Sequence, residues 1–374
     1  MKKIAIITLH RVRNYGSSLQ TLALQEIIKS KGFEVEVIDY YPERYTSFGL
    51  LKRLKNKSEV LKKNPVLLFG ARVIISFSYL KKKIVFDSFL KNNINLTPKT
   101  YRSEKELLEN PIIADAYCTG SDQVWNSLWN EGIDAPLYLS FIDENKYKFS
   151  YAASIGNSSI DQEEGEIVKK YLASYNHLSV REDSGVNILK ELGFENVIQV
   201  LDPTLLLDAS GWERFTSNRY SGQKYVLTYN LHHDPKIDKY ANEIAKKYNL
   251  EVFNISYNWH DIYRKGKLKW CPKIEEYLGL IKNAQYVVTD SFHATVFSLI
   301  FHRNFVVIYP EHASSRLRSI LKQTNLEIRG ADEMPDIELV NHKIPFDNVD
   351  EKLKLLRQES ISFLDKVLGE IKNL

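Results

Sequence analysis

The sequence predicts an α/β protein made of two Rossmann-like domains, whose parallel sheets face each other across a cleft. Three observations lead to this prediction. Short apolar runs typical of buried strands alternate with longer stretches of helical spacing, and the alternation begins again after residue 205. Clusters of polar side chains follow the ends of several predicted strands, where open α/β sheets bind ligands. The length of 374 residues also favours two domains over one.

We assign residues 1–205 to the first domain. The chain enters a buried strand almost directly after Met1, and the first helix is expected to end at Gly32. The predicted strands of this domain are 3–8, 33–38, 112–118, 148–153, 177–180 and 196–200, and the predicted helices are 17–31, 163–174 and 183–192.

Residues 206–345 are predicted to form the second domain, because the same order of elements starts again there. Residues 346–374 are predicted to form an amphipathic C-terminal helix that crosses back to the first domain. The second domain has predicted strands at 224–229, 250–255, 285–289 and 304–308, and predicted helices at 235–248, 273–282, 292–302 and 314–324.

The segment 44–91 is basic and has helical spacing. We interpret it as packed helices with one solvated face, and the alternative is a helix that lies on a membrane surface. Lysines and arginines bracket its apolar part, 66–80, at Lys52, Arg53, Lys55, Lys57, Lys62, Lys63 and Lys81–Lys83.

Composition narrows the class of protein. A net charge of +4, with charges of both signs spread along the chain, does not favour nucleic-acid binding. The only two cysteines, Cys118 and Cys271, imply neither a disulfide framework nor a cysteine zinc site. The first apolar run is too short for a signal peptide, and no apolar run is long enough for a membrane span. We therefore expect a cytoplasmic protein, with peripheral contact to the inner membrane face as an extension of the basic segment.

The most informative polar cluster is Asp290, Ser291 and His293, which follows the predicted strand 285–289 and opens an apolar helix. A helix start presents free N–H groups and a positive dipole end, which suits an anion. A histidine there can exchange a proton near neutral pH. The alternative is structural: Asp290 or Ser291 caps the helix, and His293 is a hydrogen-bonded residue of its first turn.

Two clusters in the first domain have similar positions. In the segment Asn14–Ser17, Gly16 permits close approach of the backbone, and Ser17 or Ser18 is expected to cap the following helix. The segment Gly120–Asn126 combines hydrogen-bonding side chains with Trp125, which suits a sugar. We therefore predict that the cleft is lined by Asn14, Tyr15, Gly16, Ser17, Ser121, Asp122, Gln123 and Trp125. A capped turn and a turn around a buried tryptophan are the structural alternatives.

Three arginines are candidate anion ligands. Arg181 follows the strand 177–180, where its planar guanidinium could hold a carboxylate or a phosphate, or else pair with Glu182 or Asp183. Arg316 and Arg318 follow the strand 304–308 at the start of a helix, an unfavourable position for a cation unless an anion is near.

The pair His232 and His233 does not predict a metal site. Adjacent residues of an extended segment point to opposite faces, and no third ligand is evident. We therefore expect no metal. Neither a G-x-S-x-G motif nor a Cys/His pair calls for covalent catalysis.

Taken together, six segments resemble the polysaccharide pyruvyl transferase family. They occur in order from near the N-terminus to about residue 325, and no single one decides the resemblance. The segments are Asn14–Ser17, Gly120–Asn126, Ser150–Gly156, Ser179–Glu182, Val200–Thr204 and Thr289–His293.

The resemblance implies a two-domain fold of the GT-B type and a transferase that uses phosphoenolpyruvate as donor. Its members form a cyclic ketal between the pyruvyl group and two sugar hydroxyls of a surface polysaccharide, with no cofactor. Arg181 matches a family arginine expected to bind the donor, and His293 matches a family histidine expected to bind phosphate or act as acid and base. Asp290 is then expected to orient His293. The first domain would carry Arg181 and the side of the cleft for a sugar or lipid-linked oligosaccharide acceptor.

The sequence departs from the family at one site. Well-studied members read Arg-Leu-His where this chain has Ser291-Phe292-His293, so the cation two residues before the histidine is missing. Arg316 or Arg318 could supply the missing positive charge, and Ser291 is a further residue expected to bind the donor substrate. Two alternatives stay open here: a GT-B glycosyltransferase that uses a nucleotide sugar, and a saccharide-binding relative without catalysis.

Overall fold

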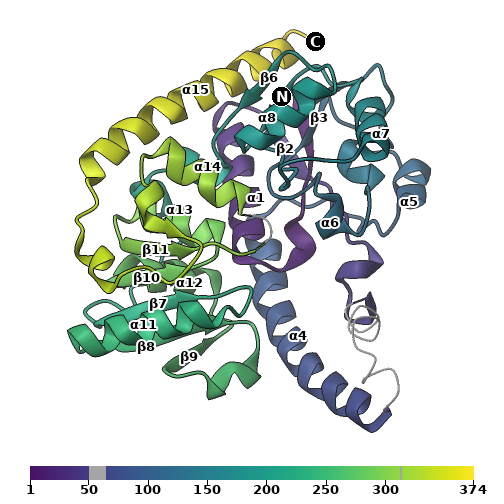
Figure 1. Ribbon diagram of the computed structural model, residues 1–374. Coiled ribbons are helices and arrows are strands. Elements are labelled where there is room, and N and C mark those ends of the chain that lie inside the picture. The colour runs from purple at the N-terminus through teal and green to yellow at the C-terminus, as the bar shows by residue number, and fades with distance from the viewer. Residues whose placement is uncertain (50–64, 312–313) are drawn as a thin grey trace.

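The computed structural model describes residues 1–49, 65–311 and 314–374. Most of the basic side chains that bracket the segment 66–80, from Lys52 to Lys63, lie outside these ranges, and so does His312. The described chain forms two α/β domains with parallel sheets, as Figure 1 shows, which confirms the predicted fold class.

The sheet of the first domain is parallel and has the strand order β2-β1-β3-β4. Apolar residues of β1 are buried, because helices cover both faces of such a sheet. A parallel pair, β5 and β6, continues the sheet through bridges from Phe149 to His177 and from Ala153 to Val180. The strands are β1 (Lys3–Ile7), β2 (Glu34–Val37), β3 (Ala116–Thr119), β4 (Tyr147–Ser150), β5 (Leu178–Val180) and β6 (Val197–Gln199).

Helices of the first domain confirm the predicted segments, but one helix begins earlier than expected. Residue Asn14 caps α1 by accepting a hydrogen bond from the Gly16 N–H at 2.8 Å, so the prediction of a cap at Ser17 or Ser18 is wrong. The Ser17 side chain instead donates a hydrogen bond to Asp122 and lines the cavity between the domains. The helices are α1 (Tyr15–Ser30), α4 (Pro65–Asn93), α5 (Glu104–Glu109), α6 (Ser127–Asn130), α7 (Gln162–Leu172), α8 (Asp183–Glu191), α9 (Pro203–Leu206) and α10 (Ala209–Glu213).

The second domain has a six-stranded parallel sheet of order β12-β11-β10-β7-β8-β9. Neither of the two outermost strands was predicted from the sequence, because β9 is partly exposed at an edge and β12 has only two residues. The strands are β7 (Tyr225–Tyr229), β8 (Glu251–Ser256), β9 (Lys267–Trp270), β10 (Tyr286–Thr289), β11 (Asn304–Ile308) and β12 (Gly330–Ala331). The helices are α11 (Pro235–Tyr248), α12 (Ile274–Asn283), α13 (Phe292–Ile300), α14 (Ser315–Gln323) and α15 (Phe346–Lys372).

The C-terminal helix α15 crosses from the second domain to the first, as predicted (Figure 1). Near its end, Glu370 accepts hydrogen bonds from the Tyr147 hydroxyl and pairs with His177, both at 2.7 Å. Earlier in the helix, the Ser360 hydroxyl accepts a hydrogen bond from the backbone of Leu201 at 2.9 Å. Helix α15 therefore fastens the two domains on one side.

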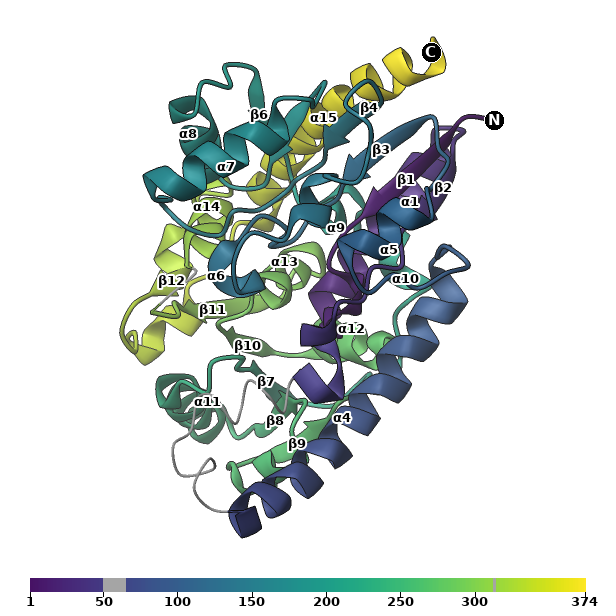
Figure 2. The ribbon, with the colours of Figure 1, turned by 90° about the vertical axis from the view of Figure 1, so that its right-hand side faces the viewer.

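Helix α4 fastens them on another side. It extends from the first domain along β8 and β9 of the second, as Figures 1 and 2 both show. Phe77 stacks on Trp270 with ring centres 5.2 Å apart, and the Ser78 hydroxyl accepts a hydrogen bond from the Trp259 N–H at 3.3 Å. The described part of the segment 44–91 is therefore packed, as its first interpretation predicted. Membrane contact of this segment stays a prediction.

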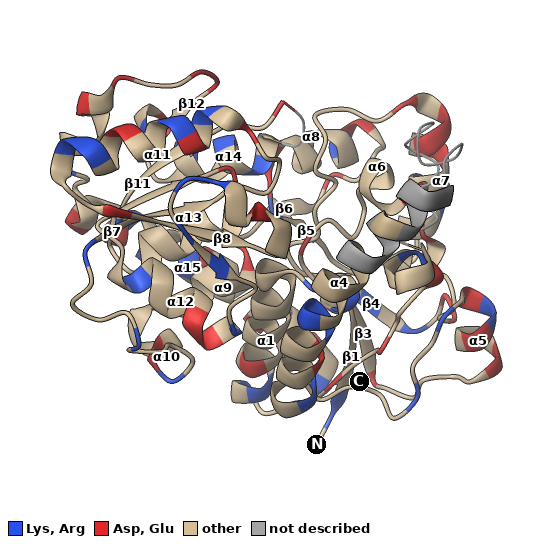
Figure 3. Cartoon of the chain, turned by 90° about the horizontal axis from the view of Figure 1, so that it is seen from below, with Lys and Arg blue, Asp and Glu red and all other residues tan. Residues whose placement is uncertain are grey.

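Charges are mixed over the molecule. Figure 3 shows lysines and arginines interspersed with acidic residues on both domains, in agreement with the small net charge. None of the helices in the described ranges combines the length and the apolar character that crossing a membrane requires.

Candidate active site

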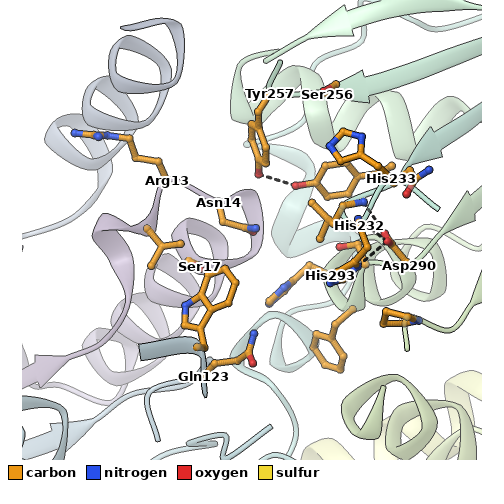
Figure 4. A pocket seen from close by; sticks show the side chains of 18 of the residues that line it. Arg13, Asn14, Ser17, Gln123, His232, His233, Ser256, Tyr257, Asp290 and His293 are labelled. Carbon is orange, nitrogen blue, oxygen red and sulfur yellow. Dashed lines mark hydrogen bonds and ion pairs between the residues drawn. The ribbon is translucent and has the colours of Figure 1, made fainter. Parts of the chain in front are cut away.

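A cavity of about 670 Å³ lies between the two domains, at the carboxyl ends of the parallel strands. Loops after β3 and β10 contribute to its wall, and so do the start of α1, helix α4 and the start of α14. Figure 4 shows side chains of both domains pointing into it. This is the position at which open α/β sheets place their ligands. Polar lining residues include Asn14, Ser17, Asp122, Gln123, Asn126, Asp290, Ser291, His293 and Arg316.

The cavity brings His293 against the first domain. It lies in the first turn of α13, whose N-cap is Ser291, as one of the alternative interpretations predicted. Its ring packs directly on Gly16 of α1, since a Cβ atom built there would be 1.9 Å from Nδ1. Only glycine leaves room for this contact, so Gly16 matters for the position of the ring rather than for a ligand.

A buried carboxylate, Asp202, lies beside His293. Its Oδ2 atom is 3.6 Å from His293 Nε2, and it accepts hydrogen bonds from Arg181 Nη1 at 2.7 Å and from the Ser121 hydroxyl at 3.1 Å. Burial opposes ionisation, but His293 and Arg181 hold the pKa of Asp202 well below its usual range. Asp202 therefore keeps its negative charge next to the ring of His293.

Arg181 does not line the cavity. It is 4% exposed and is held between Asp202 and Asp122, whose Oδ1 is 3.7 Å from its Nη2, while its guanidinium lies 4.5 Å from the centre of the Phe292 ring. Burial lowers the pKa of Arg181, but Asp202, Asp122 and then Glu182 raise it above its usual value. The structure thus places Arg181 one layer behind the surface that a ligand would touch.

The carboxylate of Asp122 faces the cavity from the first domain. It accepts hydrogen bonds from the Ser17 hydroxyl at 2.5 Å and from the Gln123 N–H at 2.9 Å. Its φ of 75° lies in the left-handed region that favours glycine. Burial raises the pKa of Asp122, but Arg181, His293 and Arg316 lower it by more. The net pKa therefore lies below the usual value, and the group is ionised. Residues with such backbone angles occur often in functional sites.

The expected role of Asp290 is wrong. Its carboxylate accepts hydrogen bonds from the backbone N–H groups of Leu231 and His232 at 2.8 and 2.9 Å, and it pairs with the His232 ring at 2.7 Å. It therefore fixes the loop after β7 instead of orienting His293. The residue beside His293 is Asp202.

The two arginines of α14 have different positions. Arg316 lines the cavity, with Nη1 3.9 Å from Asp122 Oδ1, and burial together with Arg181 lowers its pKa to about 10. In contrast, Arg318 pairs with Asp332 and lies 3.9 Å from the centre of the Tyr309 ring. Arg318 is half exposed outside the cavity, so its prediction as a donor ligand is wrong.

Three predicted cleft residues belong to the core instead. Trp125 is 1% exposed, stacks on Tyr138 and donates its Nε1–H to the Leu137 carbonyl. Tyr15 is fully buried, with its ring centre 4.1 Å from that of Tyr277. The third residue, Ser121, is buried, does not line the cavity and donates a hydrogen bond to Asp202.

Several wall residues were not predicted. Asp202, which is buried behind the wall, comes shortly after strand β6, and no role was predicted for it beyond its place in the segment Val200–Thr204. Trp129, which is 44% exposed, lines the cavity in place of Trp125. No pattern in the sequence separates these two tryptophans, since both follow the same strand. Lys82 of α4 also reaches the wall from a segment that has no strand end nearby.

Two atoms of the wall are buried without a hydrogen-bond partner among the described residues: His293 Nε2 and Arg316 Nε. Buried polar groups are paired in the great majority of cases, so such atoms at a cavity indicate a place for a ligand. Across the described ranges, His, Cys, Asp and Glu side chains form no group of three or more that could hold a metal ion.

The fold and this site define a two-domain α/β protein of the GT-B-like type, with a polar cleft that contains a histidine and an arginine. A model of the polysaccharide pyruvyl transferase family matches residues 14–312, more than half of the chain. The protein therefore belongs to the polysaccharide pyruvyl transferase family. None of the curated proteins matches it.

Solved structures with a similar fold come from other families. The S. aureus MnaA–UDP co-structure aligns with a TM-score of 0.55 and 10% identity, covering 99% of this chain and 97% of that one. The UDP-GlcNAc 2-epimerase of Methanocaldococcus jannaschii, in complex with UDP-GlcNAc and UDP, aligns with a TM-score of 0.52 and 14% identity over 96% and 100% of the two chains. A putative UDP-N-acetylglucosamine 2-epimerase from Listeria monocytogenes gives 0.52 and 11%, over 96% and 90%. At these identities the similarity concerns the fold alone.

Proposed function

We propose that this protein transfers the pyruvyl group of phosphoenolpyruvate to two hydroxyls of a sugar, which forms a cyclic ketal and releases phosphate. The observation that carries the proposal is that a histidine and an arginine, His293 and Arg316, line the same polar cavity, where His293 Nε2 and Arg316 Nε have no hydrogen-bond partner among the described residues. Phosphoenolpyruvate carries a phosphate and a carboxylate, and both would be hydrogen-bonded by such donors.

Arg316 is the residue that we assign to the donor phosphate. It lines the cavity that also contains Ser291, the residue found where well-studied members of the family have an arginine. Its closest carboxylate contact in the described chain is 3.9 Å, to Asp122, so its charge is only weakly compensated. An anionic donor would complete that compensation, and the guanidinium would hold the phosphate as it leaves.

His293 is the residue that we assign to proton transfer. In the first step its imidazolium donates a proton to the methylene carbon of the donor, and a cationic centre develops at the adjacent carbon. The first sugar hydroxyl attacks that carbon, and its proton passes to His293. The second hydroxyl then displaces the phosphate, which carries the last proton away. Asp202 offsets the positive charge of the ring at 3.6 Å while it is protonated.

The acceptor would lie on the opposite wall, which the first domain provides. The side chains of Asn14, Gln123 and Asn126 offer amide donors and acceptors to sugar hydroxyls, and the exposed Trp129 offers an apolar face to the ring. Ser17 and Asp122 hydrogen-bond each other there. Because Asp122 is ionised, its carboxylate would accept a hydrogen bond from a sugar hydroxyl and so orient it.

Calorimetric titration with phosphoenolpyruvate, and in parallel with UDP and UDP-sugars, tests the donor without knowledge of the acceptor. Saturable binding of phosphoenolpyruvate, at a stoichiometry near one and weaker in His293→Ala, is the expected result. Binding of UDP and UDP-sugars with no response to phosphoenolpyruvate would replace the proposal with a nucleotide-sugar glycosyltransferase. Binding of saccharides alone would indicate a relative without catalysis.

A further inference from the structure

A second uncompensated cation, Lys82 of α4, lines the same cavity as Arg316. Its Nζ atom lies 4.1 Å from the centre of the Tyr257 ring, and no carboxylate of the described residues is within 4.0 Å of it. Its neighbours differ in this respect. Lys83 and Arg13 both pair with Asp87, at 2.8 and 3.0 Å.

The acidic residues of the cavity do not offset this charge. Asp122 is engaged by Ser17 and lies near Arg316. Asp290 is engaged by the backbone of the loop after β7 and by His232. Each lining carboxylate therefore has nearby donors, whereas the ammonium group of Lys82 lies over the ring of Tyr257, near Cys271 and the cation of Arg13, with no carboxylate of the described residues within ion-pair distance.

Two histidines of the second domain offer ring N–H groups to the same cavity. The side chains of His233 and His260 are about half exposed and line the same cavity, 4.0 and 3.8 Å from the carboxylate of Asp261. Asp261 itself is 1% exposed and accepts a hydrogen bond from the Ser256 hydroxyl, with Arg264 at 4.0 Å. Its single charge is thus shared among three nearby cationic or titratable groups.

This region is separate from the site assigned to the donor. Figure 4 shows Tyr257, Ser256 and His233 toward one end of the view and Gln123 toward the other, with His293 between them. The two regions also come from different elements: Lys82 lies on a helix of the first domain that reaches along β8, and Arg316 lies on α14. A ligand held at Lys82 would leave His293 accessible.

We propose that Lys82, together with His233 and His260, forms a second anion-binding subsite, which takes a phosphate or diphosphate group carried by the acceptor. That this region binds an anion is inferred from its geometry alone. That the anion belongs to the acceptor rests on the proposed function. A lysine ammonium is a compact point charge that suits a phosphate, and the ring of Tyr257, which also lines the cavity, suits an apolar or aromatic group next to it. The donor phosphate would then be bound by Arg316, and the acceptor phosphate by Lys82.

The lowered pKa of Lys82 agrees with its lack of a carboxylate partner. Burial lowers the pKa of Lys82, Cys271 raises it and Arg13 lowers it, which leaves the pKa at about 8. The other group that faces it is the ring of Tyr257, whose own pKa burial raises well above the usual value. The folded protein thus holds this cation at a cost that a bound anion would offset.

Titration of the full chain with inorganic pyrophosphate tests the subsite directly. In Lys82→Met the affinity should fall by about tenfold or more, and in Lys82→Arg, which keeps the charge, it should fall by less than about threefold. Lys83→Met is the matched control, because it removes an adjacent lysine that pairs with Asp87, and binding there should stay within about twofold. Unchanged affinity in Lys82→Met, or equal losses in Lys82→Met and Lys83→Met, would overturn the proposal. Circular dichroism of each variant verifies that it is folded.

Uridine diphosphate and farnesyl diphosphate distinguish the source of the phosphate. If either binds more tightly than pyrophosphate and depends on Lys82 in the same way, the carrier is a nucleoside or a lipid, respectively. Equal affinities would identify the diphosphate alone as the recognised group. The outcome is independent of the donor: a protein that binds pyrophosphate through Lys82 but does not bind phosphoenolpyruvate keeps this subsite and loses the proposed function.

Discussion

Gly16 of the first domain and His293 of the second are in direct contact across the cleft. A Cβ atom at residue 16 would lie 1.9 Å from His293 Nδ1 and 2.4 Å from Cε1, so a glycine is required for the observed position of the ring. Helix α15 and helix α4 hold the two domains together on either side of this contact. The position of the histidine is therefore determined by both domains, and a change in the first domain should alter the chemistry of the second.

We predict that Gly16→Ala lowers kcat by about tenfold or more while the protein stays folded. Position 16 lies within α1, where alanine is favoured over glycine by about 1 kcal/mol, so the backbone tolerates the change. The new methyl group would displace the ring of His293. Gly369→Ala is the matched control, because it adds a methyl group to a helix where nothing lies within 4 Å. Equal activity in the two variants would show that the ring position does not matter.

Asp202→Asn should lower kcat by about a hundredfold, the size of a lost proton-transfer step, with little effect on the Kd of phosphoenolpyruvate. The asparagine keeps the shape of the side chain but removes the charge that lies 3.6 Å from His293 Nε2. The pH dependence of kcat provides a second readout, since it should shift when the negative charge is removed. An unaltered pH profile would assign Asp202 a structural role only.

Arg181→Met should affect stability before it affects donor binding. Arg181 is buried between Asp202 and Asp122, so its loss removes the nearest cation from two buried carboxylates. Removal of one member of a buried ion pair costs roughly 3–5 kcal/mol. Chemical denaturation measures this loss, and Arg214→Met, at an exposed arginine, serves as the control. If Arg181→Met has normal stability but no longer binds phosphoenolpyruvate, the family expectation of direct donor contact is correct.

Lys82→Met should stabilise the protein, because an uncompensated cation is replaced by an apolar side chain of similar length. We expect a rise in Tm of roughly 2 °C at pH 7, the order that 1 kcal/mol produces in a large domain. The folded pKa of about 8 lies below the usual 10.5, so the cost of the charge is present in full below pH 8. It decreases as pH rises from about 8 to 10.5, and the Tm gain should decrease with it. A loss of stability at pH 7 would indicate that Lys82 has a structural partner.

Most of the fold could be predicted because its elements are strongly patterned. Strand β1 is an unbroken apolar run, and α11 has its apolar residues on one face, so both were located within one or two residues. Strand β12 was missed because two residues carry no period, and β9 because its side chains are partly exposed. The start of α1 was missed because Asn14 competed with two serines as the cap.

The candidate site could be located but not assembled from sequence. Strand ends correctly identified His293 and Asp122, because the carboxyl ends of parallel strands meet at one edge. The partners of these residues depend on distances across the domain interface, which have no local pattern. The carboxylate beside His293 therefore proved to be Asp202, and the arginine of the wall proved to be Arg316 and not Arg318.

The central claim is that phosphoenolpyruvate binds at the wall that contains His293 and Arg316. Calorimetric titration of phosphoenolpyruvate into the wild type, Arg316→Met and Arg318→Met tests it most directly, because the two arginines lie on one helix and only Arg316 lines the cavity. Our account predicts saturable binding in the wild type, about tenfold or greater weakening in Arg316→Met, and wild-type affinity in Arg318→Met. No binding to the wild type, or equal affinities in the two variants, would contradict it.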